Sequence, residues 1–338
     1  MAKTLSRLVF MLILLGIAAV TAAIAAGFFG HLHPALDSFA HFRAHLAVLL
    51  GLVCLPLFAT RYLKVGAVGV LGAILAFATT SGTVPIPGLG KEYGPLYAGD
   101  PKEPSYRLLQ LNLLYNNKQP ELVLSMIGRV QPDVLTLEEV SHPWEEKLKL
   151  LSAAYPYSII CPDPEDHRRV AILSRRPFRL GTQPFCDGEG VIAIASIDFG
   201  GRSADIAALH LSWPWPHKQY WQVEGLKPFF ERIGESAILA GDLNAVPWSQ
   251  TPARVAKYGG LTQMPSPGST WLFLELPRYL LFAGLPIDQV FAKGDIRVHS
   301  IQRLYAVGSD HSPLLVTFSL KRSEEPAQIS QTDIALAD

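Results

Sequence analysis

Polar residues of the kind that bind hard cations or relay protons follow several apolar segments in the second half of the chain. Six segments end in this way, at Asn112, Glu139, His210, Asp242 with Asn244, Asp288, and Asp310 with His311. A single acid, amide or histidine in such a place is usually a turn or surface residue. Because the strands of a sheet bring their ends to one rim, six together predict a shared site.

The residue types in this set are suited to metal-assisted hydrolysis of a phosphoester. Asn112, Glu139 and Asp310 offer oxygen ligands and no thiolate, a combination that favours Mg²⁺ or Mn²⁺ over Zn²⁺. A hard cation stabilises the charge that develops on the phosphoryl oxygens. Water must also lose a proton, so Asp242 is expected to act as a base or to orient the water.

The remaining members of the set have supporting roles in this hypothesis. Asn244 and His210 are expected to donate to non-bridging phosphoryl oxygens, and Asp288 to hold the imidazole of His311 in one tautomer. Trp213 and Trp271 would lie on the substrate side if their loops fold toward the site, where they could stack on bases or enter a bilayer surface. Ordinary packing of these rings in their loops is an equally good interpretation.

The elements that must position these residues alternate between strands and helices, which indicates a layered α/β domain. Strands are expected over 107–113, 134–137, 170–173, 191–199, 205–210, 237–239, 290–291, 298–304 and 314–320, and helices over 121–130, 144–154, 219–233 and 251–258.

The first 82 residues differ from the rest in having few charges, which are Lys3, Arg7, Asp37, Arg43, Arg61 and Lys64. Apolar runs over 8–29, 45–60 and 65–81 predict about three transmembrane helices. A cleaved signal peptide is the alternative for the first run, because basic residues precede it and small residues follow. The two further apolar runs favour a membrane region, since neither would be stable in water alone.

The basic residues predict an orientation in the inner (cytoplasmic) membrane. Lys3, Arg7, Arg61 and Lys64 belong on the cytoplasmic side, so three spans would place the rest of the chain on the outer, periplasmic side. The expected organisation is a membrane region over 1–82, a linker rich in Pro and Gly over 83–105, a catalytic domain over 106–320 and a disordered tail over 321–338.

Charge and cysteine content leave two questions open. From Pro101 onward the chain has 23 Lys and Arg against 26 Asp and Glu, a net charge of −3. This balance argues against avid, non-specific duplex binding, although a bound cation would add local positive charge. Cys161 and Cys186 could form a disulfide in an oxidising compartment or remain as two buried thiols.

Taken in order, these motifs resemble the endonuclease/exonuclease/phosphatase superfamily of deoxyribonuclease-like folds over roughly Tyr106 to Leu320. The segments that resemble the family's motifs are Leu109–Asn112, Asp133–Val140, Ala171–Arg175, Leu209–Leu211, Gly241–Asn244, Thr270–Trp271, Ile287–Phe291 and Gly308–Pro313. The chain departs from the pattern at Glu138, where glutamine is usual, and at Gln289, where histidine is usual; Glu139 then matches the metal ligand.

The resemblance implies an α+β fold, a four-layer α/β/β/α sandwich of two packed mixed β-sheets flanked by helices. It also implies in-line attack by a water that the metal and Asp242 assist. The family includes enzymes that act on DNA, abasic sites, phospholipids and inositol phosphates, so the fold does not choose the substrate. We expect a phosphoester substrate, either nucleic acid or a phospholipid head group, and contact with a lipid bilayer through the N-terminal helices; no protein partner can be inferred.

A catalytically silent membrane scaffold that retains the fold is the alternative from another functional class. The presence of every expected catalytic and metal-binding residue, from Asn112 to His311, argues against it.

Overall fold

The computed structural model describes residues 2–81, 93–100, 103–162 and 169–321. The expected tail, apart from Lys321, and the segments 83–92 and 101–102 of the expected linker lie outside the described residues. The division into membrane region, linker, catalytic domain and tail therefore stays a prediction.

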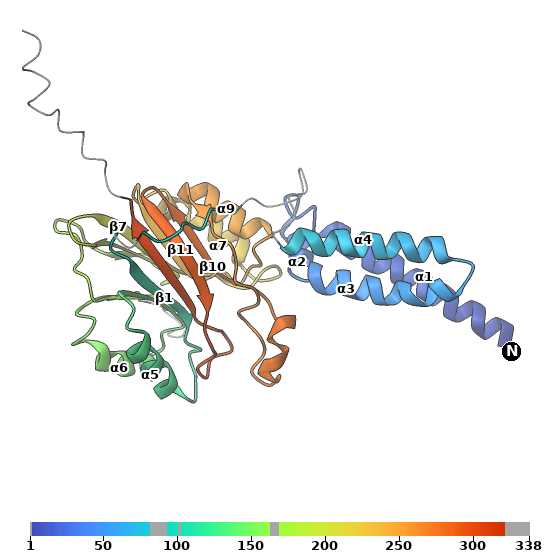
Figure 1. The fold of residues 1–338 in the computed structure, drawn as a ribbon, viewed down its shortest axis with the longest axis horizontal. Helices are drawn as coiled ribbons and strands as arrows, with labels where there is room; N and C mark the ends of the chain where they lie inside the picture. Colours follow the sequence, from blue (N-terminus) through green and yellow to red (C-terminus); the bar gives the residue numbers. More distant parts are fainter. Residues whose placement is uncertain (1, 82–92, 101–102, 163–168, 322–338) are drawn as a thin grey trace, which may run out of the picture.

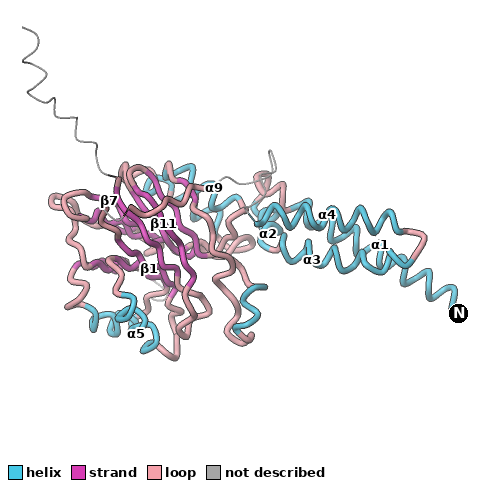
Figure 2. The backbone as a smooth tube through the Cα atoms, in the orientation of Figure 1, coloured by secondary structure: helices cyan, strands magenta, loops and turns pink. Residues whose placement is uncertain are grey.

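The described part beyond residue 105 contains two six-stranded sheets packed face to face (Figures 1 and 2). The first has the order β11-β12-β1-β2-β4-β3 and the second β5-β6-β7-β8-β10-β9. Each sheet contains one parallel pair, β1 with β2 and β7 with β8, among antiparallel neighbours. The strands are β1 Tyr106–Asn112, β2 Val134–Glu138, β3 Tyr157–Ile160, β4 Ala171–Ser174, β5 Phe185–Cys186, β6 Ile192–Asp198, β7 Ser203–His210, β8 Ala237–Asp242, β9 Thr262–Gln263, β10 Asp288–Lys293, β11 Ile296–Arg303 and β12 Leu314–Leu320.

Helices cover the outer face of each sheet and complete four layers. On the first sheet lie α5 (Pro120–Val130), α6 (His142–Leu148) and η2 (Lys149–Leu151), and on the second α7 (Gln219–Gly225), α8 (Lys227–Phe230) and α9 (Gln250–Gly259). The expected four-layer α+β sandwich is confirmed.

Alternation of side chains along central strands explains this layering. In β1, Leu108 packs in the core between the two sheets, whereas Leu109 and Leu111 pack beneath α5 and α6. Because both faces of a central strand are buried, adjacent positions such as Leu108 and Leu109 are both apolar.

The structure also contains elements that the sequence did not predict. These are the short strands β3, β5 and β9, the 3-10 helix η3 (Arg278–Ala283), and the helix α2 (Pro34–His41) between the first two apolar runs. The prediction of one continuous helix over 219–233 is wrong, because the segment forms two helices, α7 and α8. Pro228 lies in the first turn of α8. A proline there is tolerated, whereas inside one continuous helix its missing N–H would remove a backbone hydrogen bond.

Cys161 and Cys186, whose state the sequence left open, form a disulfide.

The N-terminal region forms a separate helical bundle that projects from one end of the sandwich (Figure 1). It comprises α1 (Ala2–Ala26), α2 (Pro34–His41), α3 (Arg43–Cys54), η1 (Leu55–Ala59) and α4 (Leu63–Ser81). Among the described residues, two helical stretches are long and apolar enough to cross a membrane, Leu8–Ala26 and Leu63–Thr80. A third is possible if Pro34–His41 and Arg43–Ala59, which meet at a 65° bend, count as one span.

The bundle and the sandwich are joined by specific contacts. The carboxylate of Asp37 in α2 accepts hydrogen bonds from the backbone N–H of Gln250 at 3.0 and 3.1 Å, at the start of α9. The indole N–H of Trp248 donates to the carbonyl of Ala40 at 2.7 Å. Both contacts fix α2 against the loop that follows β8.

Candidate active site

Strand register brings the predicted residues to one end of the sandwich. On the second sheet His210 lies opposite Asp242, and Asp242 lies opposite Asp288. On the first sheet Asn112 ends β1 and pairs with Glu138, directly before Glu139. Gly241 is required just before Asp242, because a Cβ there would collide with the carbonyl of Leu209 on β7.

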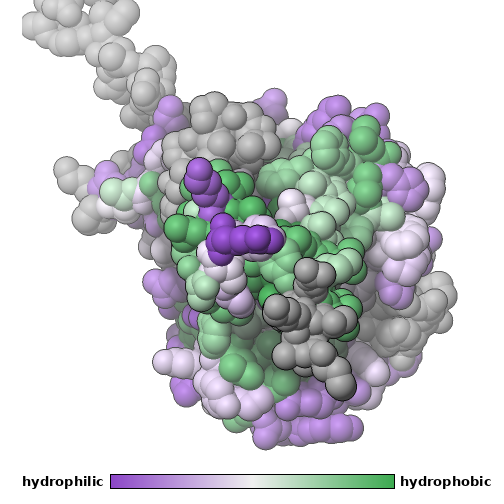
Figure 3. Space-filling view, turned by 90° about the vertical axis from the view of Figure 1, so that its right-hand side faces the viewer, coloured by the Kyte–Doolittle hydropathy of each residue, from purple (hydrophilic) through white to green (hydrophobic). Residues whose placement is uncertain are grey.

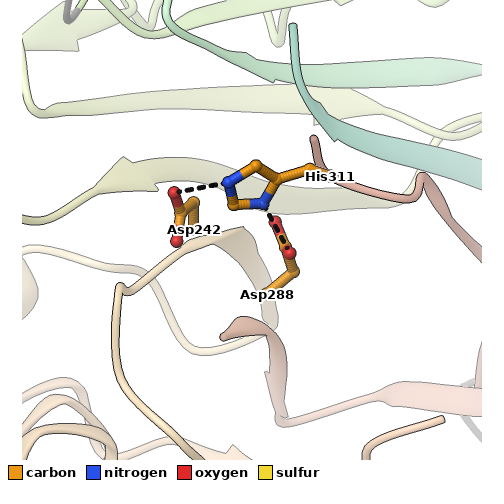
Figure 4. A group of neighbouring side chains, drawn as sticks. All are labelled: Asp242, Asp288 and His311. Atoms are coloured by element: carbon orange, nitrogen blue, oxygen red, sulfur yellow. Dashed lines mark hydrogen bonds and ion pairs between the residues drawn. The ribbon is translucent and has the colours of Figure 1, made fainter. Parts of the chain in front are cut away.

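Asp242, His311 and Asp288 form a buried carboxylate–imidazole–carboxylate arrangement at the bottom of the site (Figure 4). The Nδ1 of His311 lies 2.9 Å from Asp288 Oδ2, and its Nε2 lies 3.6 Å from Asp242 Oδ2. The Asp288 contact fixes the ring's orientation, as expected from the sequence, and directs Nε2 toward Asp242.

Burial and the neighbouring charges shift the pKa values of Asp242 and His311. Burial raises the pKa of Asp242 to about 6, helped by the carboxylate of Asp288 and opposed by His311 and His210. Burial alone would lower the pKa of His311, but the carboxylates of Asp288 and Asp242 raise it well above its ordinary value. At neutral pH Asp242 is therefore a carboxylate beside an imidazolium.

Glu138 lies beneath this arrangement and away from the cleft. It is fully buried, and its Oε2 accepts a hydrogen bond from Gln110 Nε2 at 2.9 Å. The same amide nitrogen donates to Asp288 Oδ1 at 2.8 Å. Burial and the nearby Asp288 raise the pKa of Glu138 well above its ordinary value. Glu138 supports the Gln110 amide that in turn donates to Asp288.

Glu139 faces the cleft instead, through an unusual backbone conformation. Its φ of 56° lies in the left-handed region, which is uncommon for a residue other than glycine. Its two carboxylate oxygens accept from Asn112 Nδ2 at 3.1 Å and from the backbone N–H of Tyr115 at 2.9 Å. Asn112 Nδ2 also donates to Asp242 Oδ2 at 3.0 Å, which connects the ends of the two sheets.

Asp310 reaches the same cleft from the loop before β12. Its Oδ2 accepts a hydrogen bond from the indole N–H of Trp271 at 2.9 Å. Ser309 ties this loop to β1, because its hydroxyl donates to the carbonyl of Asn112 at 2.8 Å. The position of Asp310 thus depends on both Trp271 and Ser309.

His210 and Asn244 flank Asp242. His210 Nε2 lies 3.7 Å from Asp242 Oδ2. The Asn244 amide donates to the carbonyl of Leu211 at 2.9 Å and approaches Asp242 Oδ2 at 3.4 Å, so its donors point at protein groups. Its Oδ1 is buried without a partner among the described residues. In this conformation Asn244 supports Asp242 through its backbone N–H and its side-chain amide.

These residues line a cleft of about 980 Å³ whose walls are partly aromatic. Glu139, His210, Asp242, Asn244, Asp310 and His311 form its polar part, whereas Asn112 and Asp288 lie behind that surface. Trp213 and Trp271 both line the cleft, with ring centroids 5.2 Å apart. Phe42, from the connection between α2 and α3, contributes to the same wall.

Two sets of residues could hold a cation. Asp242, Asp288 and His311 have ligand atoms within 4.8 Å of one another. Both ring nitrogens of His311, however, face carboxylates, and its raised pKa favours protonation, which opposes metal ligation. Glu139 and Asp310 present carboxylates in the cleft, with the amide of Asn112 behind them. Their oxygen donors fit a hard divalent ion, so we favour this second set.

Several residues that shape the site were not predicted from the sequence. Gln110, Ser309 and Arg278 act through hydrogen bonds to Asp288, Asn112 and Asp310. Gln110 and Ser309 lie inside the segments Leu109–Asn112 and Gly308–Pro313, whose resemblance to the family's motifs was the signal that could have indicated them. No sequence signal indicated a role for Phe42 in the site, because this residue belongs to the region expected to serve as a membrane anchor.

Comparison with known proteins places this architecture in a family. Residues 109–311 match the Endonuclease/Exonuclease/phosphatase family. None of the curated proteins matches the chain. The enzymes of this family are hydrolytic, act on phosphoester bonds and use divalent metals.

Solved structures with a similar fold include humanized D. rerio TDP2, which is 18% identical, with a TM-score of 0.50 over 64% of this chain and 99% of that chain. D. rerio TDP2 complexed with a single-strand DNA product is 17% identical, with the same TM-score over 64% and 99%. The human nocturnin catalytic domain with a bound sulfate anion is 21% identical, with a TM-score of 0.48 over 64% and 94%.

Proposed function

Because the chain belongs to the endonuclease/exonuclease/phosphatase family, we propose that it is a membrane-anchored phosphoesterase that requires Mg²⁺ or Mn²⁺. The observation that carries this proposal is the cleft in which Glu139 and Asp310 face the buried Asp242–His311–Asp288 arrangement. A bound divalent ion would neutralise charge on the phosphoryl group there, held by Glu139 and Asp310 with Asn112.

The chain's own residues supply the other parts of the reaction. Asp242, ionised at neutral pH, orients an attacking water and accepts its proton. The backbone N–H and the side-chain amide of Asn244 hold the Asp242 carboxylate in place, at 2.8 and 3.4 Å. His210 and protonated His311 lie on either side of Asp242 and donate to phosphoryl oxygens.

The membrane arrangement that we propose has three spans and a periplasmic catalytic domain. The rings of Phe10 and Tyr62 stack at 4.2 Å, so the start of α1 lies at the same end of the bundle as the connection before α4. Arg61 and Lys64 belong to that end, which the positive-inside rule assigns to the cytoplasm. The sandwich lies at the opposite end (Figure 1), and its Cys161–Cys186 disulfide suits an oxidising compartment.

The reaction class can be tested with the full chain in lipid nanodiscs. We expect release of p-nitrophenol from bis(p-nitrophenyl) phosphate with Mg²⁺ or Mn²⁺ and loss of that activity in EDTA. If neither Mg²⁺ nor Mn²⁺ supports hydrolysis of this ester, of single-stranded or duplex DNA, or of phospholipids, a scaffold without catalysis would be favoured.

The orientation can be tested by proteolysis of intact spheroplasts. Added protease should cut the chain beyond Tyr106 without permeabilising the inner membrane. Protection of that region in intact spheroplasts, with cleavage only after lysis, would contradict a periplasmic catalytic domain.

A further inference from the structure

The loop over residues 272–284, which includes η3, exposes an unusual amount of apolar surface. Its exposed large side chains are Phe273, Leu274, Leu276, Tyr279 and Phe282, and the last two are 78% and 79% exposed. Such clustering is uncommon on a surface that faces only water and marks an interaction site. We call residues 272–284 the η3 loop.

Contacts within the bundle show where the two candidate spans end. The guanidinium of Arg43 donates to the carbonyl of Gly27 at 2.9 Å and to the hydroxyl of Thr79 at 3.4 Å. Gly27 follows the span Leu8–Ala26 directly, and Thr79 is next to last in Leu63–Thr80. A charged group is stable at the end of a span rather than at its centre, so Arg43 marks the boundary of the bilayer that faces the sandwich.

The η3 loop lies at that same level. The ring Nε2 of His45, two residues after Arg43, donates to the carbonyl of Ala283 in the η3 loop at 2.7 Å. Figure 1 shows the orange helical turn of this loop beside the end of the bundle that meets the sandwich. Viewed along the bundle, hydrophobic surface surrounds a small group of hydrophilic residues near the centre, and further hydrophilic surface lies at the periphery (Figure 3). The exposed rings of the loop therefore lie beside the bundle, where lipid would begin.

The η3 loop is also tied directly to the active site. The guanidinium of Arg278 donates to the carbonyl of Asp310 at 3.1 Å and to the hydroxyl of Ser312 at 3.2 Å. Phe273 from the loop lines the catalytic cleft together with Phe42 from the bundle. An apolar wall thus runs from the candidate metal ligands toward the membrane boundary.

We propose that the η3 loop inserts into the bilayer that holds the chain's own helices, and that the cleft takes the phosphoester of a membrane amphiphile. The phosphate would meet Asp242, His210 and His311, while the apolar body lies along Phe42 and Phe273 and remains continuous with the lipid. The choice of substrate rests on the proposed catalytic activity, whereas insertion of the loop rests only on the proposed membrane anchoring.

Insertion is measured with single-cysteine labels in the full chain. Phe282→Cys carries an environment-sensitive nitrobenzoxadiazole, and the chain is reconstituted into phosphatidylcholine–phosphatidylglycerol vesicles. The matched control is Leu180→Cys, because Leu180 is 97% exposed in the connection between β4 and β5. The native cysteines do not interfere, since Cys54 is buried and the other two are bridged.

We expect a blue-shifted emission at position 282 and strong quenching by nitroxide-labelled lipid, with neither effect at position 180. Absence of lipid quenching at position 282 overturns insertion. A blue shift without lipid quenching also overturns it, because protein would then cover the loop.

The substrate class is tested with two esters that share a leaving group. The double variant Tyr279→Ser with Phe282→Ser should hydrolyse vesicle-embedded diacylglycerol p-nitrophenyl phosphate about tenfold more slowly than the wild type, since both lost rings would anchor the loop in lipid. Its rate on soluble bis(p-nitrophenyl) phosphate should stay within about twofold of wild type, because neither residue lines the cleft.

Equal rates of variant and wild type on the embedded ester, or an equal loss on both esters, overturn the membrane-amphiphile substrate. Failure of the wild type on both esters overturns the proposed function itself, while the quenching result still decides whether the loop inserts.

Discussion

The bottom and the rim of the cleft are built on different physical principles. At the bottom, Asp242, Asp288 and His311 are 1–3% exposed, and His311 contacts both carboxylates at the paired ends of β8 and β10. At the rim, Trp213 and Phe273 are 38% and 60% exposed and come from loops. The difference teaches that the chemistry is fixed by the sandwich, whereas access to it is shaped by loops and by the helical bundle.

Removal of a ring at the bottom should have the largest effect on turnover. His311→Ala removes the imidazolium between two carboxylates and should lower the rate on bis(p-nitrophenyl) phosphate about 10³-fold. Circular dichroism would verify the fold. His142→Ala on α6 is the control, because that side chain is 72% exposed, and a rate for His311→Ala near that of the control would contradict the account.

The adjacent acids Glu138 and Glu139 allow a sharper comparison within one motif. Glu139→Gln should raise the Mg²⁺ concentration for half-maximal activity about 100-fold, because it removes a carboxylate from the cleft. Glu138→Gln keeps an acceptor for Gln110 and should leave that concentration nearly unchanged. Titrations of both variants measure this, and equal shifts would mean that the assignment of Glu139 as the ligand is wrong.

A single hydrogen bond at the rim should have a smaller effect. Trp271→Phe keeps an aromatic ring but removes the N–H that donates to Asp310 Oδ2. We expect about a tenfold rise in the Mg²⁺ concentration for half-maximal activity, since Asp310 loses its orienting partner. Trp221→Phe is the control, because Trp221 is 72% exposed and does not line the cleft. Identical titrations for the two variants would refute a role for the indole N–H.

The disulfide should affect stability and leave turnover almost unchanged. Cys161→Ser with Cys186→Ser opens a link across 25 residues and should lower the free energy of unfolding by about 3 kcal/mol. Neither residue lines the cleft, so the rate at 25 °C should match the wild type. Denaturant unfolding in detergent measures the loss, and a large drop in rate without a drop in stability would conflict with this separation.

Much of the sandwich could be predicted from the sequence, because its central strands carry strong local signals. The apolar runs before Asn112, His210 and Asp242 define β1, β7 and β8, and the polar residue after each run indicates which end of the sheet bears the site. The two-residue strands β5 and β9 could not be predicted, since they form only by pairing with β6 and β10.

The parts of the site that the sequence did not predict depend on contacts between distant segments. Phe42 reaches the cleft only because Asp37 and Ala40 bind the segment Trp248–Gln250. Likewise, the sequence of the segment Leu272–Leu281 does not indicate whether its apolar side chains are buried or exposed. Their exposure depends on the position of the η3 loop beside the bundle, where His45 contacts Ala283.

The most direct test of the central claim is a Mg²⁺ titration of EDTA-stripped full-length protein on bis(p-nitrophenyl) phosphate, with wild type and Asp242→Asn in parallel. Asp295→Asn, a change at an exposed carboxylate in the turn after β10, is the control. We predict that Mg²⁺ restores hydrolysis in the wild type and the control, whereas Asp242→Asn stays at least about 10³-fold slower at saturating metal. Restoration of comparable rates in Asp242→Asn, or hydrolysis by the wild type without metal, would contradict the account.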